Sequence, residues 1–485
     1  MTTPYNLFSL GQQSKSSNLT AAHRLNLYYD VQAGPDKTQV AAYGTPGLNL
    51  FSVPTGVPTR GMHWMESVDT LFIVQGGSLI GVASNGTSQV IALSTVDLSG
   101  RVSMANNGTQ LVIISDTNAY CYNTSTAQMS YIARWIYPNL VTNPLLYPAK
   151  SVTFLAGRFI VNRNDTGQFF MSALYDGTSW DPLDYATAES NPDNLVAVAA
   201  DKGMLVLFGT SSVEIWSPYA AVAPAFPFIR VNAAPSDGGL AARWSLSNCA
   251  GYLTGLFKNR SGSLFIGQLQ GYTLVPISTT DIVYIISSYT NPTDAIGFGY
   301  TLNGRNFYQI TFISAGVTWL YDDSSKVWSQ LKGWGLTRHR ADMGAAFGTK
   351  YIVTDYLNGN LYQLSAQALT DNGDPIEREI TGGHSFTDDR NLSSIRRLRV
   401  DMMGGVGNLT GQGINPSVML QISRDGGHTF GQEMWKTIGT QGQYVQRAEW
   451  RRLGISRDWV FKIRITDPIP VCIIAAVVEG KELGC

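Results

Sequence analysis

The chain has 485 residues and a formal net charge of −1, with 14% charged and 11% aromatic residues. This length exceeds one ordinary core and suits one large fold joined to a smaller domain. The near-zero net charge argues against a chain built as a whole to hold nucleic acid. So little charge suits either an efficient β core or a subunit whose outside is partly buried against neighbours.

Targeting and cofactor signals are scarce in the sequence. The first ten residues contain no basic segment followed by an apolar one, so no signal peptide is expected. No run approaches the roughly 20 apolar residues of a membrane helix, so no membrane insertion is expected. The cysteines lack metal-ligand spacing, which predicts buried free thiols in a reducing compartment and no cofactor. They are Cys121, Cys249, Cys472 and Cys485.

Residues 1–35 are polar and have no organised apolar period. This predicts an N-terminal arm that orders only against a partner, or an extended strand that closes a larger fold. The turn-forming sequence from Tyr43 to Leu48 follows, and its apolar exit could deliver a first strand.

Residues 36–366 repeat one pattern: an apolar strand, a turn rich in Asn, Asp or Gly, and another strand. Turns such as Ser84-Asn85-Gly86-Thr87 and Leu302-Asn303-Gly304 supply the positive-φ residues of tight hairpins. A period of roughly 40 to 50 residues with several strands per unit is typical of propeller blades. The pattern predicts a six- or seven-bladed β-propeller. The units begin near Met62, Val102, Val152, Ala197, Ser245, Asp294 and Asp342.

The pattern changes after a turn near residues 370–375. Apolar and polar residues then alternate strictly, as at Leu398, Val400 and Met402. A period of two predicts strands with one buried and one solvated face. Residues 371–485 therefore read as a smaller antiparallel β-sandwich. In one of its strands, from Val418 to Ser423, Met419, Gln421 and Ser423 are expected on the solvated face.

The sandwich is locally basic, because residues 390–464 hold 12 Lys or Arg against 5 Asp or Glu. One interpretation is a solvated strand face with cross-strand pairs to Asp401, Glu449 and Asp458. The other is a surface that faces DNA phosphates or an acidic partner, without sequence specificity because no aromatic array is interleaved. The candidate interface or channel-lining residues are Arg396, Arg397, Arg399, Arg447, Arg451 and Arg452.

Residues 423–430 fit an Asp-box pattern through Ser423, Asp425, Gly427 and Thr429. Such side chains bond the backbone of their own hairpin, which predicts a structural turn.

No catalytic constellation is recognised. Three neighbouring carboxylates could serve glycoside hydrolysis, but their spacing fits no single strand face. They are Asp181, Asp184 and Glu189. The five histidines are isolated from one another, so neither a metal cluster nor a nucleophilic triad is expected.

Several segments resemble the packaged-DNA stabilization proteins of short-tailed bacteriophages. These segments are residues 101–108, 179–193, 208–216, 286–290 and 425–454, in the same order and with similar spacing. The resemblance runs from about residue 25 to 480 and implies a structural protein without catalytic residues. It implies a ring of six copies that forms the tail hub or nozzle, located in the virion tail and assembled in the host cytoplasm.

The same resemblance implies the partners of such a ring. These are other copies of the chain, the portal and head-to-tail adaptor above it, tail fibres or tailspikes, and a central needle. The ring would retain packaged DNA, contact it transiently without regard to sequence, and provide the ejection conduit. A glycan-active propeller, as a sialidase-like hydrolase or a lectin, and a cellular interaction hub remain alternative interpretations.

Overall fold

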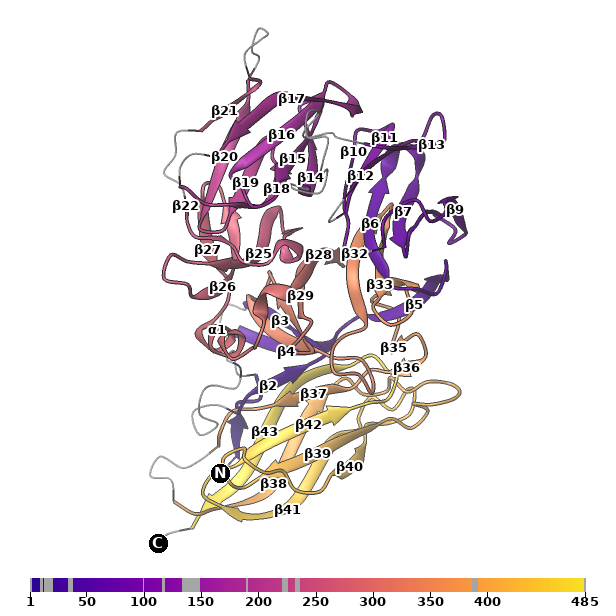
Figure 1. Cartoon of the computed structure of the whole chain (residues 1–485). Helices are drawn as coiled ribbons and strands as arrows, with labels where there is room; N and C mark the ends of the chain where they lie inside the picture. The colour runs from indigo at the N-terminus through magenta and orange to yellow at the C-terminus, as the bar shows by residue number, and fades with distance from the viewer. Residues whose placement is uncertain are drawn as a thin grey trace.

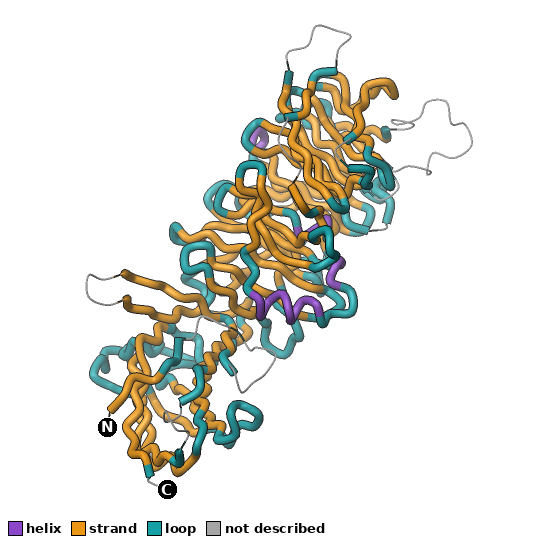
Figure 2. The backbone as a smooth tube through the Cα atoms, turned by 90° about the vertical axis from the view of Figure 1, so that its left-hand side faces the viewer, coloured by secondary structure: helices purple, strands orange, loops and turns teal. Residues whose placement is uncertain are grey.

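The computed structural model describes residues 2–8, 12, 21–33, 38–98, 100–115, 118–132, 149–188, 191–219, 226–231, 236–385 and 391–483. These residues form a β-propeller and a smaller β-sandwich, which confirms the predicted all-β fold class (Figure 1). The view in Figure 2 places the sandwich at one end of an elongated molecule, together with both labelled termini.

The propeller has seven blades in the described part of the chain, one for each unit predicted from the sequence. Each blade is an antiparallel sheet, and in the first six blades all the strands come from one continuous segment of the chain. The first blade contains β6 (Thr59–Met65), β7 (Thr70–Gln75), β8 (Ser78–Ala83) and β9 (Ser88–Ala92). The second contains β10 (Ser103–Asn106), β11 (Gln110–Ile114), β12 (Ala119–Asn123) and β13 (Gln128–Tyr131). The third contains β14 (Ala149–Leu155), β15 (Arg158–Arg163), β16 (Gln168–Ala173) and β17 (Asp176–Thr187).

The later blades add short extra strands. The fourth contains β18 (Leu195–Asp201), β19 (Met204–Gly209), β20 (Ser212–Pro218) and β21 (Phe228–Arg230), with β22 (Ser236–Asp237); the fifth β23 (Gly239–Leu240), β24 (Ser247–Cys249), β25 (Tyr252–Lys258), β26 (Leu264–Gln270) and β27 (Thr273–Pro276); the sixth β28 (Ile296–Leu302), β29 (Arg305–Phe312), β30 (Val317–Asp322) and β31 (Val327–Leu331); the seventh β32 (Ala341–Phe347), β33 (Lys350–Asp355), β34 (Leu361–Ser365) and β5 (Gly47–Ser52).

Hairpin turns lie where the Asn-Gly sequences predict them. Asn303 and Gly304 connect β28 to β29 with φ angles of 51° and 76°. Two consecutive positive φ angles match the twist of the flanking strands, and Asn followed by Gly tolerates them best. Local sequence therefore fixes this register without help from distant residues.

The apolar runs are buried on both faces because blades stack on both sides of each strand. In β11, Leu111 and Ile113 pack into the core shared with the first blade. Val112 and Ile114 point the other way and pack against the third blade. Successive residues of one strand thus fill two different inter-blade cores.

The ring is closed by β5, which pairs antiparallel with β34. Leu48 of β5 lies opposite Leu364 and is fully buried. The closing strand therefore comes from residues 47–52, directly after the expected turn at Tyr43 to Leu48. It does not come from residues 1–35.

The sandwich takes strands from both ends of the chain, unlike the expected division into residues 1–35, 36–366 and 371–485. The expected arm contributes three β-strands among its described residues, and sandwich strands continue past residue 36. These segments carry apolar residues such as Tyr5, Leu27 and Tyr29 that complete the core. One sheet has the order β3 (Leu27–Ala33), β4 (Thr38–Gly44), β43 (Cys472–Glu482), β38 (Ser393–Met402) and β41 (Ala448–Ser456), with β1 (Thr2–Tyr5) also on β43. The facing layer contains β37 (Arg378–Thr381), β42 (Val460–Ile465), β39 (Ser417–Ser423) and β40 (Met434–Thr437).

The two domains share a continuous sheet. β2 (His23–Leu25) pairs parallel with β31 of the sixth blade and antiparallel with β37 of the sandwich. Backbone hydrogen bonding therefore passes from a propeller blade into the sandwich without a flexible linker. Between β34 and β37, β35 (Thr370–Asp371) and β36 (Asp374–Pro375) form a short hairpin against β5.

Helix is rare in the described residues. One α-helix, α1 (Thr280–Ser287), begins at Thr279, whose side chain accepts a hydrogen bond from the Ile282 amide. Ile282 and Ile286, one turn apart, bury its apolar side. No helix among the described residues has the length and apolar character needed to span a membrane.

Candidate functional site

The predicted basic face lies on the sheet formed by β38, β41 and β43. Arg397 and Arg399 alternate with Leu398 and Val400, both of which are fully buried. The two arginines therefore share the outer face, as the two-residue period of a strand predicts. In the antiparallel register, Arg397 lies opposite Arg451 of β41.

Acidic side chains are interleaved with these arginines. Arg397 Nη2 lies 2.7 Å from Glu479 Oε2, and its Nη1 lies 3.5 Å from Glu449 Oε2. Arg451 Nε donates a hydrogen bond of 2.5 Å to Glu449 Oε1, and this contact lowers the pKa of the Glu449 carboxyl. The face is a mixed-charge ladder rather than a uniformly positive surface. Exposed ion pairs of this kind stabilise a fold by only about 0 to 1 kcal/mol.

Two further acids were expected in this ladder, and one of them is present. Arg399 Nε lies 3.2 Å from Asp401 Oδ1 on the same strand. Asp458 is elsewhere, where its carboxylate contacts His384 Nδ1 at 2.9 Å. Arg397 thus makes the cross-strand contacts, whereas Arg399 and Arg451 pair with acids on their own strands.

The other three arginines are exposed outside this ladder. Arg396 occupies an irregularity in the β38 register between Ile395 and Arg397. Arg452 adopts a left-handed φ of 60°, which turns it out of the regular strand. Arg447 precedes β41 by one residue, so the two-residue period of that strand does not place it on the same face as Arg451.

The Asp-box residues form one turn after β39. Ser423 Oγ lies 2.6 Å from Asp425 Oδ1 and accepts a 2.8 Å hydrogen bond from the Gly427 amide. Asp425 accepts bonds from the Thr429 amide and hydroxyl. Hydrogen bonds from Ser423 and Thr429 hold the pKa of the Asp425 carboxyl well below its usual range. The carboxylate is therefore occupied by its own turn, in the sandwich rather than in a propeller blade.

The expectation that Met419, Gln421 and Ser423 lie on a solvated face of β39 is partly wrong, because Met419 and Ser423 are both buried. Met419 is flanked in register by Arg464 and Trp435, whose long side chains share its face. Ser423 is buried in the turn described above.

The carboxylates considered for hydrolysis do not assemble in the described residues. Asp181 accepts a hydrogen bond from the Leu183 amide, and Asp184 lies 3.9 Å from Arg158. Glu189 lies outside the described residues. The described part of the chain also contains no cluster of three or more His, Cys, Asp or Glu residues placed to hold a metal.

Three of the cysteines are buried free thiols, as predicted, and Cys485 lies outside the described residues. Burial raises the pKa of the Cys121 and Cys249 thiols to about 12. These groups therefore remain protonated at neutral pH, so they are poor nucleophiles and poor metal ligands.

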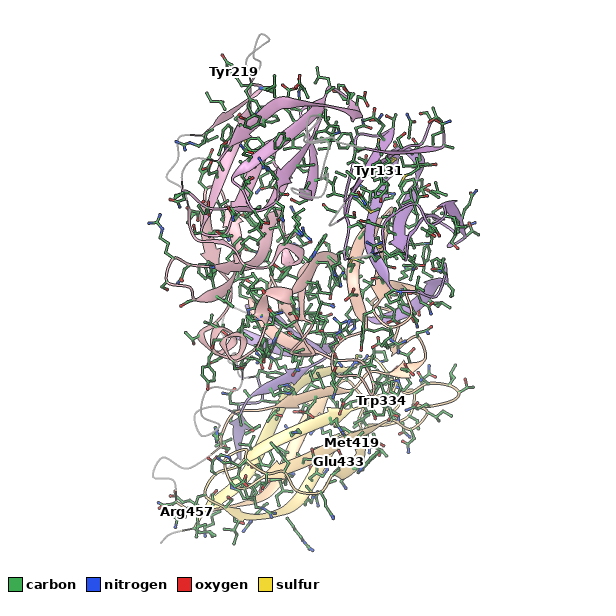
Figure 3. All side chains as sticks on the ribbon, in the orientation of Figure 1. Tyr131, Tyr219, Trp334, Met419, Glu433 and Arg457 are labelled. Atoms are coloured by element: carbon green, nitrogen blue, oxygen red, sulfur yellow. The ribbon has the colours of Figure 1, made fainter. Side chains whose placement is uncertain are left out.

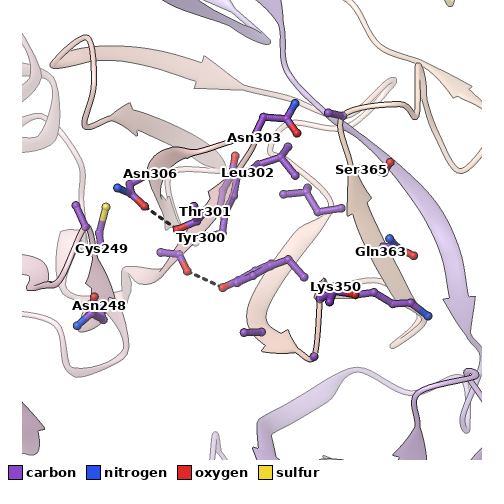
Figure 4. A pocket seen from close by; sticks show the side chains of 18 of the residues that line it. Asn248, Cys249, Tyr300, Thr301, Leu302, Asn303, Asn306, Lys350, Gln363 and Ser365 are labelled. Carbon is purple, nitrogen blue, oxygen red and sulfur yellow. Dashed lines mark hydrogen bonds between the residues drawn. The ribbon is translucent and has the colours of Figure 1, made fainter.

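A polar hollow of about 670 Å³ lies among blades five, six and seven (Figure 4). Its walls are hydrogen-bonded to one another: the Tyr351 hydroxyl donates to the Gly299 carbonyl, and the Thr301 hydroxyl donates to Asn306. Lys350 is the one charged residue among its described lining residues. Burial raises the pKa of Tyr351, so the hollow offers neutral hydroxyl and amide groups rather than an acid–base pair.

The junction between the domains is a polar and aromatic contact that the sequence analysis did not find. Arg305 of β29 donates to Asp30 Oδ1 at 3.0 Å and to the Tyr29 carbonyl at 2.8 Å, both on β3. The same guanidinium donates to Asp322 Oδ2 at 3.1 Å. It also lies over the ring of Tyr28. In the sequence, Arg305 directly follows a hairpin turn, which is an ordinary surface position, so this contact could not be predicted from its neighbours.

Large apolar side chains are exposed on both domains. Figure 3 labels Tyr131 and Tyr219 at the end of the propeller far from the sandwich, and Trp334 nearer the junction. About half of each of these side chains is exposed. In the sandwich, Leu409 and Val445 are still more exposed, at 81% and 91%. Large apolar side chains exposed in this way are candidates for contacts with other chains.

These features define a class of protein: a seven-bladed propeller fused through shared strands to a sandwich, with balanced charges and no assembled catalytic group in its described residues. The family description "Bacteriophage P22 Gp10, beta-propeller" matches residues 11–369, and "Bacteriophage P22 Gp10, beta-sandwich" matches residues 382–481. The chain therefore belongs to the Bacteriophage P22 Gp10 family.

One curated relative is the "Tail hub protein gp10" of Salmonella phage P22, which is 26% identical over 261 residues. The match covers 53% of this chain and 53% of the relative, so the chain spans about half the length of that relative.

Solved propeller structures are more distant. A streptogramin B lyase structure has 10% identity and a TM-score of 0.43, over 66% of this chain and 98% of that chain. A virginiamycin B lyase from Staphylococcus aureus has 9% identity and a TM-score of 0.42, over 70% and 99%. Likenesses this distant carry no argument about activity.

Proposed function

We propose that this protein is a structural subunit of the tail hub of a short-tailed bacteriophage, located in the virion tail. The observation that carries the proposal is the family match to propeller and sandwich in the same order along the chain. The name of the P22 relative, a tail hub protein, supports the same role.

In this role the chain forms a ring, which we propose to contain six copies, below the portal and adaptor. The ring retains packaged DNA, provides the ejection conduit and carries tail fibres or tailspikes. The exposed apolar side chains on both domains and the low overall charge favour a subunit that is covered by neighbours. A contact with DNA would be transient, because the arginine ladder is balanced by acids and would attract phosphates only weakly.

We also propose that the protein is not an enzyme. The Asp-box turn is a single hairpin in the sandwich, and its carboxylate is bound to its own backbone. The carboxylates Asp181 and Asp184 are likewise engaged locally. These contacts give no support to the sialidase-like alternative.

The proposed role is tested with phage particles assembled in the absence of this protein. Such particles are expected to package DNA and then lose it, because internal pressure expels the genome through an open channel. Supplying purified wild-type protein before release should restore retention, measured as nuclease-resistant DNA per particle. Particles that keep full genomes without the protein would contradict the role. A separate sizing experiment with adaptor present should give a ring near six times 52.8 kDa.

A further inference from the structure

Arg378 of β37 is a buried arginine whose charge the described residues compensate only in part. Its side chain is only 2% exposed, and its Nε and Nη1 atoms have no hydrogen-bond acceptor in the described part of the chain. Gly44 lies directly against the guanidinium, where a Cβ atom would collide with Nε. A buried charge is costly unless an opposite charge or hydrogen bonds compensate it.

The acid that acts on Arg378 electrostatically is Asp371, and it compensates the arginine only in part. Asp371 is also 2% exposed, and its Oδ1 atom likewise lacks a hydrogen-bond partner. Burial raises the pKa of Asp371 to about 7, so a substantial fraction of this carboxyl is neutral near neutral pH. Burial also lowers the pKa of Arg378, but only to about 10, so the guanidinium remains charged.

Arg378 lines a cavity of about 490 Å³ at the junction of the two domains. One wall of this cavity is aromatic. The rings of Tyr28 and Tyr43 stack at 5.8 Å with 23° between their planes, and Phe307 meets Tyr28 edge-on at 5.5 Å. Met403, which is 39% exposed, contributes another part of the lining. The volume is within the range of small-ligand sites, which are largely apolar and contain few polar groups.

We infer that this cavity binds a carboxylate attached to an apolar body, with the carboxylate on Arg378 and the body against Tyr28, Tyr43 and Phe307. A guanidinium donates charge-assisted hydrogen bonds to a carboxylate and neutralises its charge. The aromatic wall adds apolar burial, which a small hydrated inorganic anion cannot use. The carboxylate belongs either to a free organic acid or to the C-terminus of a polypeptide, and these two sources share the same chemistry.

The ligand would contact both domains. The cavity lining includes Leu302 and Asn303 of the sixth blade and Pro470 and Val471 of the sandwich. A molecule that binds only the folded arrangement stabilises it increasingly as its free concentration rises above its dissociation constant. Binding is therefore expected to raise the thermal midpoint of unfolding as well as to give a direct signal.

The test titrates the full chain with benzoate, and in parallel with a short peptide that ends in phenylalanine, followed by calorimetry and thermal unfolding. Benzamide and the C-terminally amidated peptide are the matched neutral probes. We expect saturable binding of at least one carboxylate probe and none of its neutral counterpart. Benzoate binding would indicate a free acid as the source, whereas binding of the peptide alone would indicate a chain terminus. Failure of both carboxylate probes to bind would overturn the inference.

Two variants test the position of the site. Arg378→Met should weaken binding by about tenfold or more, because hydrogen bonds to a charged group contribute about 1.5 to 3 kcal/mol. Met403→Trp fills the cavity and leaves Arg378 in place, so it decides the question if Arg378→Met fails to fold. The exposed Arg396→Met is the control and should bind like the wild type. Unchanged affinity in folded Arg378→Met, or in Met403→Trp, would overturn the assignment.

Discussion

Arg305 of the propeller and Asp30 of the sandwich form an ion pair across the domain junction, with 3.0 Å between Nη1 and Oδ1. Because the same guanidinium bonds the Tyr29 carbonyl and Asp322, one side chain connects three strands from two domains. The Arg305 side chain is 18% exposed and that of Asp322 only 3%, so these charges are shielded from solvent. The contact therefore differs in kind from the exposed arginine ladder of the sandwich.

Arg305→Met is expected to lower the free energy of unfolding by about 2 to 3 kcal/mol, because Asp322 is left buried without its cation. Urea denaturation measures the change, and Arg396→Met is the exposed control. A double-mutant cycle with Asp30→Asn should give a coupling energy that reports the cross-domain pair. Additive effects of the two substitutions would contradict a direct interaction between Arg305 and Asp30.

Leu48→Ala should destabilise the propeller by about 2 to 5 kcal/mol, because it opens a cavity in the strand that closes the ring. Leu50→Ala is a matched control in the same strand, since Leu50 is 51% exposed. The control should change the unfolding free energy of the isolated subunit by less than about 0.5 kcal/mol. Equal effects of the two substitutions would argue against β5 as the closing strand.

His339 should cause the free energy of unfolding to decrease at acidic pH. Burial lowers the pKa of His339 from 6.5 to about 4, so the unfolded chain binds this proton more readily. Stability from this group is therefore complete above pH 6.5 and is lost as pH falls toward about 4. His339→Asn keeps an acceptor for the Ala341 amide but cannot titrate, so its unfolding free energy should depend less on pH across this window.

The carboxyl of Asp371 has the opposite effect on stability over an overlapping pH range. Because its pKa is raised in the folded protein, its contribution to stability is lost as pH rises from 3.8 toward 7. The comparison of wild type with His339→Asn isolates the histidine contribution. The exposed His428→Gln serves as the control for removing an imidazole. Identical pH profiles for wild type and His339→Asn would contradict the prediction.

Arg397→Glu places a third acid between Glu449 and Glu479, and it should lower the unfolding free energy of the subunit by about 1 kcal/mol. Arg396→Glu, outside the ladder, should have a smaller effect.

Reversal of Arg397, Arg399, Arg447 and Arg451 together separates the proposed roles of this surface. Loss of ring assembly would indicate a protein partner, whereas intact rings with slow genome ejection would indicate contact with DNA. We expect loss of assembly, because a strongly attractive wall would hold back DNA that must leave quickly. Normal assembly and normal ejection would leave these arginines as a solvated strand face.

Local signals predicted most of the propeller. Each blade is built from neighbouring strands and short turns, so pairs such as Asn303-Gly304 fix hairpins within a few residues. The sandwich was only partly predictable, because β1 and β4 pair with β43, which lies more than about 400 residues away. A polar segment with few apolar residues has no apolar period from which such strand pairing could be predicted. The Arg378 cavity was invisible for the same reason, since its walls come from segments between Tyr28 and Val471.

The pairing of β1 with β43 has a consequence for synthesis on the ribosome. The propeller can close its ring once β34 has emerged from the ribosome, because its partner β5 is synthesised much earlier. The sandwich cannot assemble at that stage, because β43 contributes to its sheet from residues 472–482. The strand β1 therefore remains unpaired until β43 has been synthesised. A nascent chain arrested before residue 472 should thus present a closed propeller with exposed strand edges, which is the stage most vulnerable to aggregation.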